Sequence, residues 1–114
     1  MMKTEACSFC DQVWFHSKLV DEINNVFALY KDSSSSIAGN YYSDLFLDCI
    51  YNRKTIVIRT NDFGAHIISH LKNLPCEQIE QVIGDAMVAR LLDIRPAFEV
   101  RQMIKEKRIV WRIE

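Results

Sequence analysis

The sequence predicts an α+β fold in a single compact domain over residues 1–114. Three observations support this prediction. Several segments repeat apolar residues at helical spacing, others alternate them as strands do, and a length of 114 residues suits one domain. Because helices and sheets each have an apolar face to bury, the two kinds of element are expected to pack on one another. We expect an N-terminal amphipathic helix, a small antiparallel sheet and three further helices.

The first helix is expected over residues 11–31. Its inner face is marked by side chains that recur at steps of three and four, namely Val13, His16, Val20, Ile23, Phe27 and Tyr30. Residues 1–9 precede this pattern and are expected to form a flexible N-terminus. Asp32 and the four serines at 33–36 should end the helix, and a loop should follow.

The sheet is expected from a hairpin over residues 45–60 and a terminal strand over 108–113. Residues 55–60 are rich in β-branched side chains, which favours a strand. The preceding segment alternates as a strand does at Leu45, Leu47, Cys49 and Tyr51, whereas a helical face would instead group Tyr42, Leu45, Phe46 and Cys49. The terminal strand should bury one face, formed by Ile109, Trp111 and Ile113.

The three further helices are expected over residues 63–73, over 76–92 and after Pro96. Asn61 or Asp62 can cap the first of them by accepting hydrogen bonds from backbone N–H groups. Pro75 and Pro96 suit the beginning of the other two, because proline is tolerated in the first turn of a helix.

Charge and composition limit the function classes. Fifteen acidic side chains against fourteen basic ones give a net charge of −1, which excludes a generally basic nucleic-acid coat. Residues 1–50 carry seven acids and three bases, whereas residues 90–114 carry seven bases and four acids. No apolar run approaches the ~20 residues that span a bilayer, and no secretory signal is seen. We expect a cytoplasmic protein with no membrane partner and with reduced cysteines.

Two pairs of metal-ligand residues are present but far apart in the sequence. Cys7 and Cys10 form a CxxC pair, and His66 and His70 lie four residues apart on a predicted helix. Together they would make a Cys2His2 set for zinc. The gap of 55 residues between the two pairs is much longer than in compact zinc modules. We therefore predict no bound cofactor and keep zinc at these four residues as the alternative.

The sequence offers no recognisable catalytic set, so we predict that the protein is not an enzyme. Ser69 and His70 are neighbours, but adjacent side chains on a helix point about 100° apart and cannot form a catalytic pair. Gly39, Gly64 and Gly84 are isolated, so no glycine-rich phosphate loop is present.

The expected function is that of a small regulator that binds a protein partner. The acidic half of the chain is rich in aromatic residues, and Tyr41 and Tyr42 beside the serine loop are expected to be exposed. With Asp44 and Asp48 they form the predicted partner-binding surface, because aromatic anchors and acidic surroundings suit a basic partner such as a toxin or nuclease. An inhibitor of the immunity-protein or antitoxin type, or an adaptor subunit, fits this description.

The alternative is DNA binding through residues 86–113. This segment resembles the helix-turn-helix of excisionase-type DNA-binding proteins, although Asp93 stands where the turn usually has glycine. The resemblance implies that Arg101, Gln102 and Lys105 face the major groove and that the basic strand contacts phosphates through Arg108 and Arg112. The apolar face of the same terminal strand could also pair across a homodimer.

Overall fold

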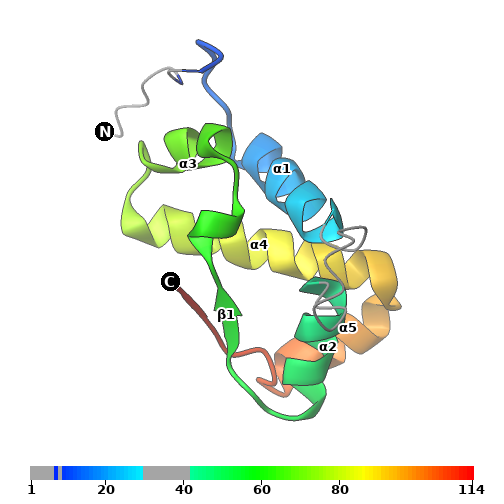
Figure 1. Ribbon diagram of the computed structural model, residues 1–114. Coiled ribbons are helices and arrows are strands. Elements are labelled where there is room, and N and C mark those ends of the chain that lie inside the picture. Colours follow the sequence, from blue (N-terminus) through cyan, green and yellow to red (C-terminus); the bar gives the residue numbers. More distant parts are fainter. Residues whose placement is uncertain (1–6, 8, 30–41) are drawn as a thin grey trace.

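The computed structural model describes residues 7, 9–29 and 42–114, and this part of the chain is mostly helical (Figure 1). In chain order the elements are α1 (His16–Leu29), α2 (Tyr42–Tyr51), β1 (Ile56–Ile58), the short 3-10 helix η2 (Thr60–Asp62), α3 (Ala65–Leu71), α4 (Cys76–Ile94), α5 (Ala97–Lys105) and β2 (Trp111–Ile113). The loop expected after residue 31 lies outside the described residues, as does Tyr41.

The core is built around α4, the longest helix described. Helix α1 packs along it through Leu19, Ile23 and Phe27, all fully buried. These residues are spaced by four, which places them on one face of α1 and confirms the predicted inner face at Ile23 and Phe27. The prediction is wrong at Val13, which precedes the helix, and at His16, because both are exposed. The facing side of α4 contributes the buried residues Val82, Ile83, Ala86, Met87 and Leu91.

The predicted hairpin over residues 45–60 is wrong. Residues 42–51 form helix α2, and the residues that it buries are Tyr42, Phe46, Cys49 and Ile50. Packing against Phe27 favours the helix over the strand. The Phe27 ring contacts those of Tyr42 and Phe46 at centroid distances of 4.7 and 5.2 Å. Only a helix brings Tyr42 and Phe46, four residues apart, onto the same side of the chain as Cys49.

The predicted antiparallel sheet is also wrong, and with it the α+β class as stated. The described chain has a single small sheet, in which β1 and β2 run parallel with Ile56 opposite Trp111 and Ile58 opposite Ile113. Since α3, α4 and α5 lie between the two strands in the sequence, the connection is a crossover, which is how parallel strands are joined. The fold is therefore mostly helical, with a two-stranded parallel sheet.

The remaining helices follow the sequence pattern. Helices α3, α4 and α5 lie within or close to the predicted ranges, and Pro75 and Pro96 immediately precede α4 and α5. Gly64, and not Asn61 or Asp62, is the residue before α3.

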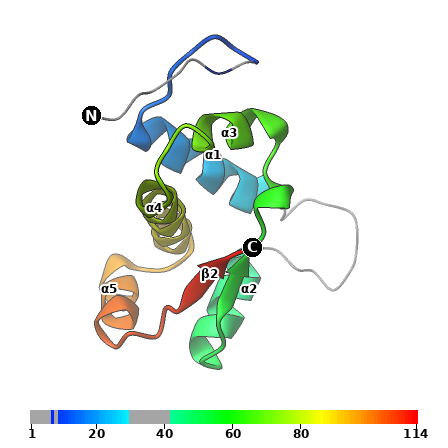
Figure 2. The ribbon, with the colours of Figure 1, turned by 90° about the vertical axis from the view of Figure 1, so that its left-hand side faces the viewer.

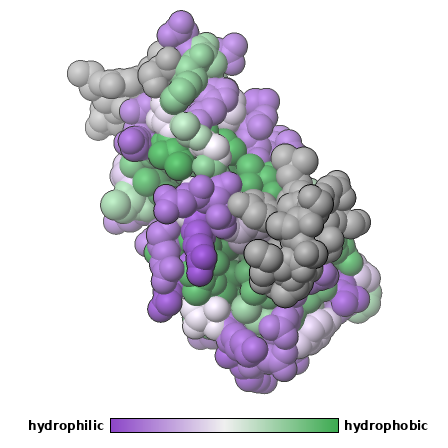
Figure 3. All heavy atoms as spheres, viewed as in Figure 1, coloured by the Kyte–Doolittle hydropathy of each residue, from purple (hydrophilic) through white to green (hydrophobic). Residues whose placement is uncertain are grey.

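Hydrophilic side chains cover much of the face drawn in Figure 3, and hydrophobic ones appear between them in separate patches. No helix in the described part of the chain is both long enough and apolar enough to cross a membrane.

Candidate metal centre

The structure brings the two pairs of metal-ligand residues together. Cys7 and Cys10 lie in the segment before α1, which passes beside α3 (Figures 1 and 2). His66 and His70 lie one helical turn apart on α3. The four ligand atoms all lie within 4.8 Å of one another. The long gap in the sequence is therefore closed by the fold.

A tight turn holds the two cysteines. The backbone N–H of Asp11 donates to the carbonyl oxygen of Cys7 at 2.8 Å, and the N–H of Cys7 donates to Gln12 at 3.0 Å. Asp11 has a φ of 55°, a left-handed conformation that aspartate adopts more readily than most residues. The N–H of Phe9 points at the Cys7 sulfur at 3.3 Å. This turn places both sulfur atoms on the side facing α3.

The separation of one pair of candidate ligand atoms matches a tetrahedral metal site. The Cys10 Sγ lies 3.5 Å from the His70 Nε2. Zinc bonds of about 2.3 Å to sulfur and about 2.0–2.1 Å to nitrogen, set at the tetrahedral angle, would hold these two atoms about 3.6 Å apart. The pair thus stands close to the separation that zinc requires.

His66 provides independent support for a ligand site. Its Nε2 is buried and has no hydrogen-bond partner in the described part of the chain. Buried polar atoms in folded proteins are nearly always paired, and one without a partner calls for an explanation. A metal ion bound at this nitrogen would supply the missing partner.

Neighbouring side chains fix the ligands in place. The indole of Trp14 stacks on the His70 ring. The centroid of the same indole lies 4.7 Å from the centroid of the His66 ring. The Cys7 sulfur lies 3.6 Å from the hydroxyl of Ser69. Cys7 and His70 are buried, with exposed fractions of 1% and 5%. Such surroundings orient ligands and limit the access of water.

The same surroundings shift the pKa of three ligands. Burial raises the pKa of the Cys7 thiol, but hydrogen bonds from Phe9, Ser69 and Cys10 outweigh burial, and the net pKa is lowered. Burial raises the pKa of Cys10, with the neighbouring Cys7 adding to the effect. Burial, together with His66, lowers the pKa of His70. A thiolate at Cys7 and a neutral imidazole at His70 are the forms that bind metal.

The predicted partner-binding residues are not arranged as expected. Tyr42 is only 5% exposed, so the prediction that this residue is exposed is wrong. Its hydroxyl donates to Asp62 at 2.5 Å and its ring belongs to the core. Asp44 and Asp48 are exposed on α2. A role of these two carboxylates in partner binding stays a prediction.

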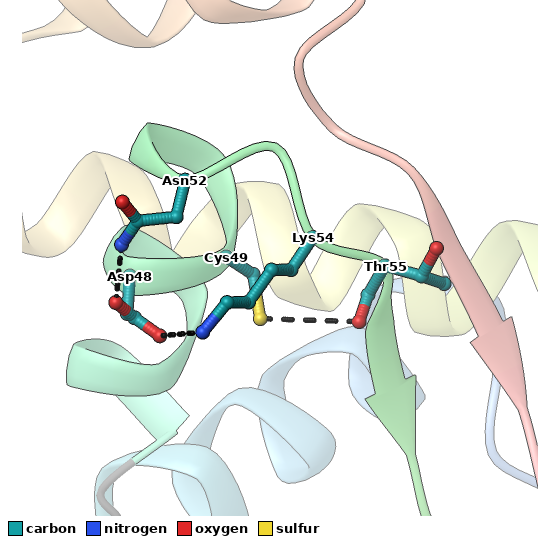
Figure 4. Close-up of polar contacts among 5 residues, drawn as sticks. All are labelled: Asp48, Cys49, Asn52, Lys54 and Thr55. Carbon is teal, nitrogen blue, oxygen red and sulfur yellow. Dashed lines mark hydrogen bonds and ion pairs between the residues drawn. The ribbon is translucent and has the colours of Figure 1, made fainter.

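Asp48 also has a local structural role (Figure 4). Its carboxylate accepts a hydrogen bond from Asn52 at 2.6 Å and lies 3.7 Å from the Lys54 ammonium group. The thiol of Cys49 lies 3.9 Å from the carbonyl oxygen of Thr55, and burial raises its pKa. These contacts tie the end of α2 to the segment that leads into β1.

Four of the five candidate DNA-binding residues are exposed and Arg108 is half-buried, and several of them are paired with acidic groups. Gln102 donates to Glu106 at 2.8 Å, and the Arg108 guanidinium lies 2.6 Å from the Glu106 carboxylate. Arg112 pairs with Glu114 at 3.0 Å. Arg101 and Lys105 are exposed on α5. This pairing reduces the positive charge offered to phosphates, and DNA binding stays a prediction.

Sequence reasoning found the four candidate ligands but missed the residues around them. Trp14 precedes α1 and its ring lies against those of both histidines. Ser69 was considered only as a nucleophile. Its position three residues after His66 on a helix was the available signal that it lies on the same side of α3 as that histidine.

Comparison of the chain with protein-family models, with curated proteins and with solved structures gave no match.

Proposed function

We propose that the protein is a small non-catalytic zinc-binding domain, with Cys7, Cys10, His66 and His70 as the ligands of one structural zinc ion. The observation that carries this proposal is the convergence of the four ligand atoms within 4.8 Å of one another. The unpartnered Nε2 of His66 and the separation of 3.5 Å between Cys10 and His70 support it.

Zinc is favoured by the chemistry of the ligands. Two sulfur and two nitrogen atoms in a tetrahedral arrangement suit zinc, whereas calcium and magnesium prefer oxygen ligands. With four protein ligands, the ion would have no open position for water or substrate. Such closed sites are structural, and catalytic zinc sites instead keep a position free.

The proposed role of the ion is to hold the N-terminal segment against α3. Phe9, on the turn between the cysteines, has an exposed fraction of 65%, and Phe15 one of 78%. A metal ion that fixes this turn would therefore fix the exposed side chain of Phe9, whereas Phe15 lies outside the turn, immediately before α1. A domain of this kind works through its surface, which fits the expected class of a non-catalytic protein that binds a partner.

Metal analysis of the full chain tests the proposal. Protein purified under reducing conditions should contain one zinc ion per chain, and cobalt should replace it with the visible absorption of a tetrahedral thiolate site. Cys10→Ser and His66→Ala should each lose stoichiometric zinc. Wild-type protein that takes up neither metal would exclude the site.

The chain offers matched controls for both residue types. Cys76 is an exposed cysteine at the start of α4, and His16 is an exposed histidine at the start of α1. Neither belongs to the group of four. Cys76→Ser and His16→Gln should therefore retain one zinc ion per chain. Loss of zinc in these controls would mean that the metal is bound elsewhere.

A further inference from the structure

The sheet has an open edge on the outer side of β2. Strand β2 directs the backbone groups of Val110 and Glu114 toward β1, since Ile56 donates to the Val110 carbonyl and the Glu114 N–H donates to Ile58. Backbone groups of successive residues point to opposite sides of a strand, so those of Trp111 and Ile113 point away from β1. No partner strand is present on that side within the described residues. Such an edge is a template for another strand.

Helix α4 forms a wall beside this edge. Two hollows lie between α4 and the segment around β2. The first is lined by Gly84, Val88 and Val110, among others, and the second by Glu80, Arg112 and Ile113. Trp111 lines both hollows. A Cβ atom added at Gly84 would lie 3.0 Å from the Trp111 ring, so the helix and the strand are in close contact there. Figure 2 shows α4 end-on, to one side of β2.

The sequence of the strand complements itself in antiparallel pairing. If Trp111 faces Trp111 of a second copy, Arg108 faces Glu114, Ile109 faces Ile113 and Val110 faces Arg112. The dimer then has two pairs, each between Arg108 of one copy and Glu114 of the other, in place of the present contacts of Arg108 with Glu106 and of Glu114 with Arg112. Opposite charges placed directly across two strands stabilise the pairing. The exposed side chain of Val110 would lie against the aliphatic stem of Arg112.

The backbone permits this register. Residues whose backbone N–H and C=O groups point away from β1 are spaced by two along the strand. Ile109, Trp111 and Ile113 therefore all direct these groups to the open edge. In the register centred on Trp111 these three residues face one another, as hydrogen-bonded antiparallel pairs require. A register shifted by one residue would place inward-pointing groups opposite outward-pointing ones. Charge and hydrogen bonding thus select the same alignment.

We propose that the protein forms a two-fold symmetric dimer in which β2 pairs antiparallel with β2 of a second copy. The two small sheets become one sheet of four strands, in the order β1-β2-β2-β1. The interface is isologous, as is usual for dimers of identical chains. This inference does not rest on the zinc site, which lies on α3 and the N-terminal segment.

Charge reversal at the two ends of the strand tests the dimer. The molar mass of the full chain, measured by sedimentation over a range of concentrations, should rise to that of a dimer. Arg108→Glu and Glu114→Arg should each remain monomeric, because each places like charges opposite one another. An equimolar mixture of the two variants should form a heterodimer, because both cross-strand pairs then become attractive. Arg101→Glu, a reversal on the exposed surface of α5, should dimerise as the wild type does.

A second measurement does not depend on the charges. Val110 and Arg112 are exposed, so cysteines there should not disturb the fold. With a mild thiol oxidant added to take up the two electrons, a mixture of Val110→Cys and Arg112→Cys should form a disulfide between copies, located by peptide mass spectrometry. A wild-type chain that stays monomeric at all concentrations would overturn the proposal. So would single charge reversals that leave the dimer intact, or a mixture that forms no 110–112 crosslink.

Discussion

Trp14 lies face to face with His70, with ring centroids 3.9 Å apart and planes that differ by 10°. The indole also contacts His66, so one side chain covers both histidines of the candidate site. Trp14 itself has no atom suited to binding the metal. Its contribution is to hold the two rings in the orientation that directs their nitrogen atoms toward the cysteines.

Trp14→Ala should therefore weaken metal binding without removing it. We expect an affinity loss of roughly 10-fold or more, the effect of losing a residue that orients ligands. Competition with a chromophoric chelator measures the change. Phe15→Ala is the control, because Phe15 is adjacent in sequence but 78% exposed, and it should leave the affinity unchanged. An unaltered affinity in Trp14→Ala would show that the stacking does not position the ligands.

Removal of zinc by a chelator should lower the midpoint of thermal unfolding. A ligand that binds only the folded state stabilises that state, and 1 kcal/mol corresponds to about 4–8 °C for a domain of 60–100 residues. We expect a decrease of at least about 5 °C for the wild type. The midpoint of Cys10→Ser should be the same with and without chelator. Equal shifts in both proteins would indicate an effect unrelated to the site.

Tyr42→Ala should strongly destabilise the protein. The ring is buried against Phe27 and Phe46, and truncation of a buried aromatic residue costs about 3–5 kcal/mol. Tyr42→Phe removes only the hydroxyl that donates to Asp62 and should cost about 1–2 kcal/mol. Urea unfolding measures both. If Tyr42→Ala unfolded like the wild type, the ring would not be part of the core.

The effect of Gly84→Ala should depend on residue 111. Alanine is favoured over glycine inside a helix by about 1 kcal/mol, but here its Cβ would meet the Trp111 ring at 3.0 Å. In wild-type background we expect no gain in stability or a loss. In Trp111→Phe background the crowding is relieved, and Gly84→Ala should stabilise by about 1 kcal/mol. A double-mutant cycle from chemical denaturation gives the coupling, and strictly additive effects would exclude the contact.

The helices could be predicted because their packing follows a local pattern. The faces of α1 and α4 repeat apolar residues every three or four positions, and the prolines before α4 and α5 mark where these helices begin. Segment 42–51 could not be settled locally, because its apolar residues fit both periods. The tertiary contacts of Tyr42 and Phe46 with Phe27 favour the helix.

Strand direction and the candidate site depend on long-range geometry. Nothing within residues 108–113 indicates that β2 pairs with β1 in parallel, since the crossover through three helices sets that direction. In the same way, the spacing within each ligand pair is visible in the sequence, but the approach of Cys10 to His70 is created by the fold. Sequence spacing alone therefore gave no sign that the fold brings these four residues together.

The parallel pairing of β1 with β2 also sets an order of events during synthesis. Ile56 and Ile58 leave the ribosome long before Trp111 and Ile113, the residues opposite them. Until then β1 has no neighbouring strand in the described chain, and its backbone groups stay available to other nascent chains. Contacts between residues so distant in sequence form slowly. The nascent protein thus passes through a period in which α1–α4 can associate while the strand edge is still a risk for aggregation.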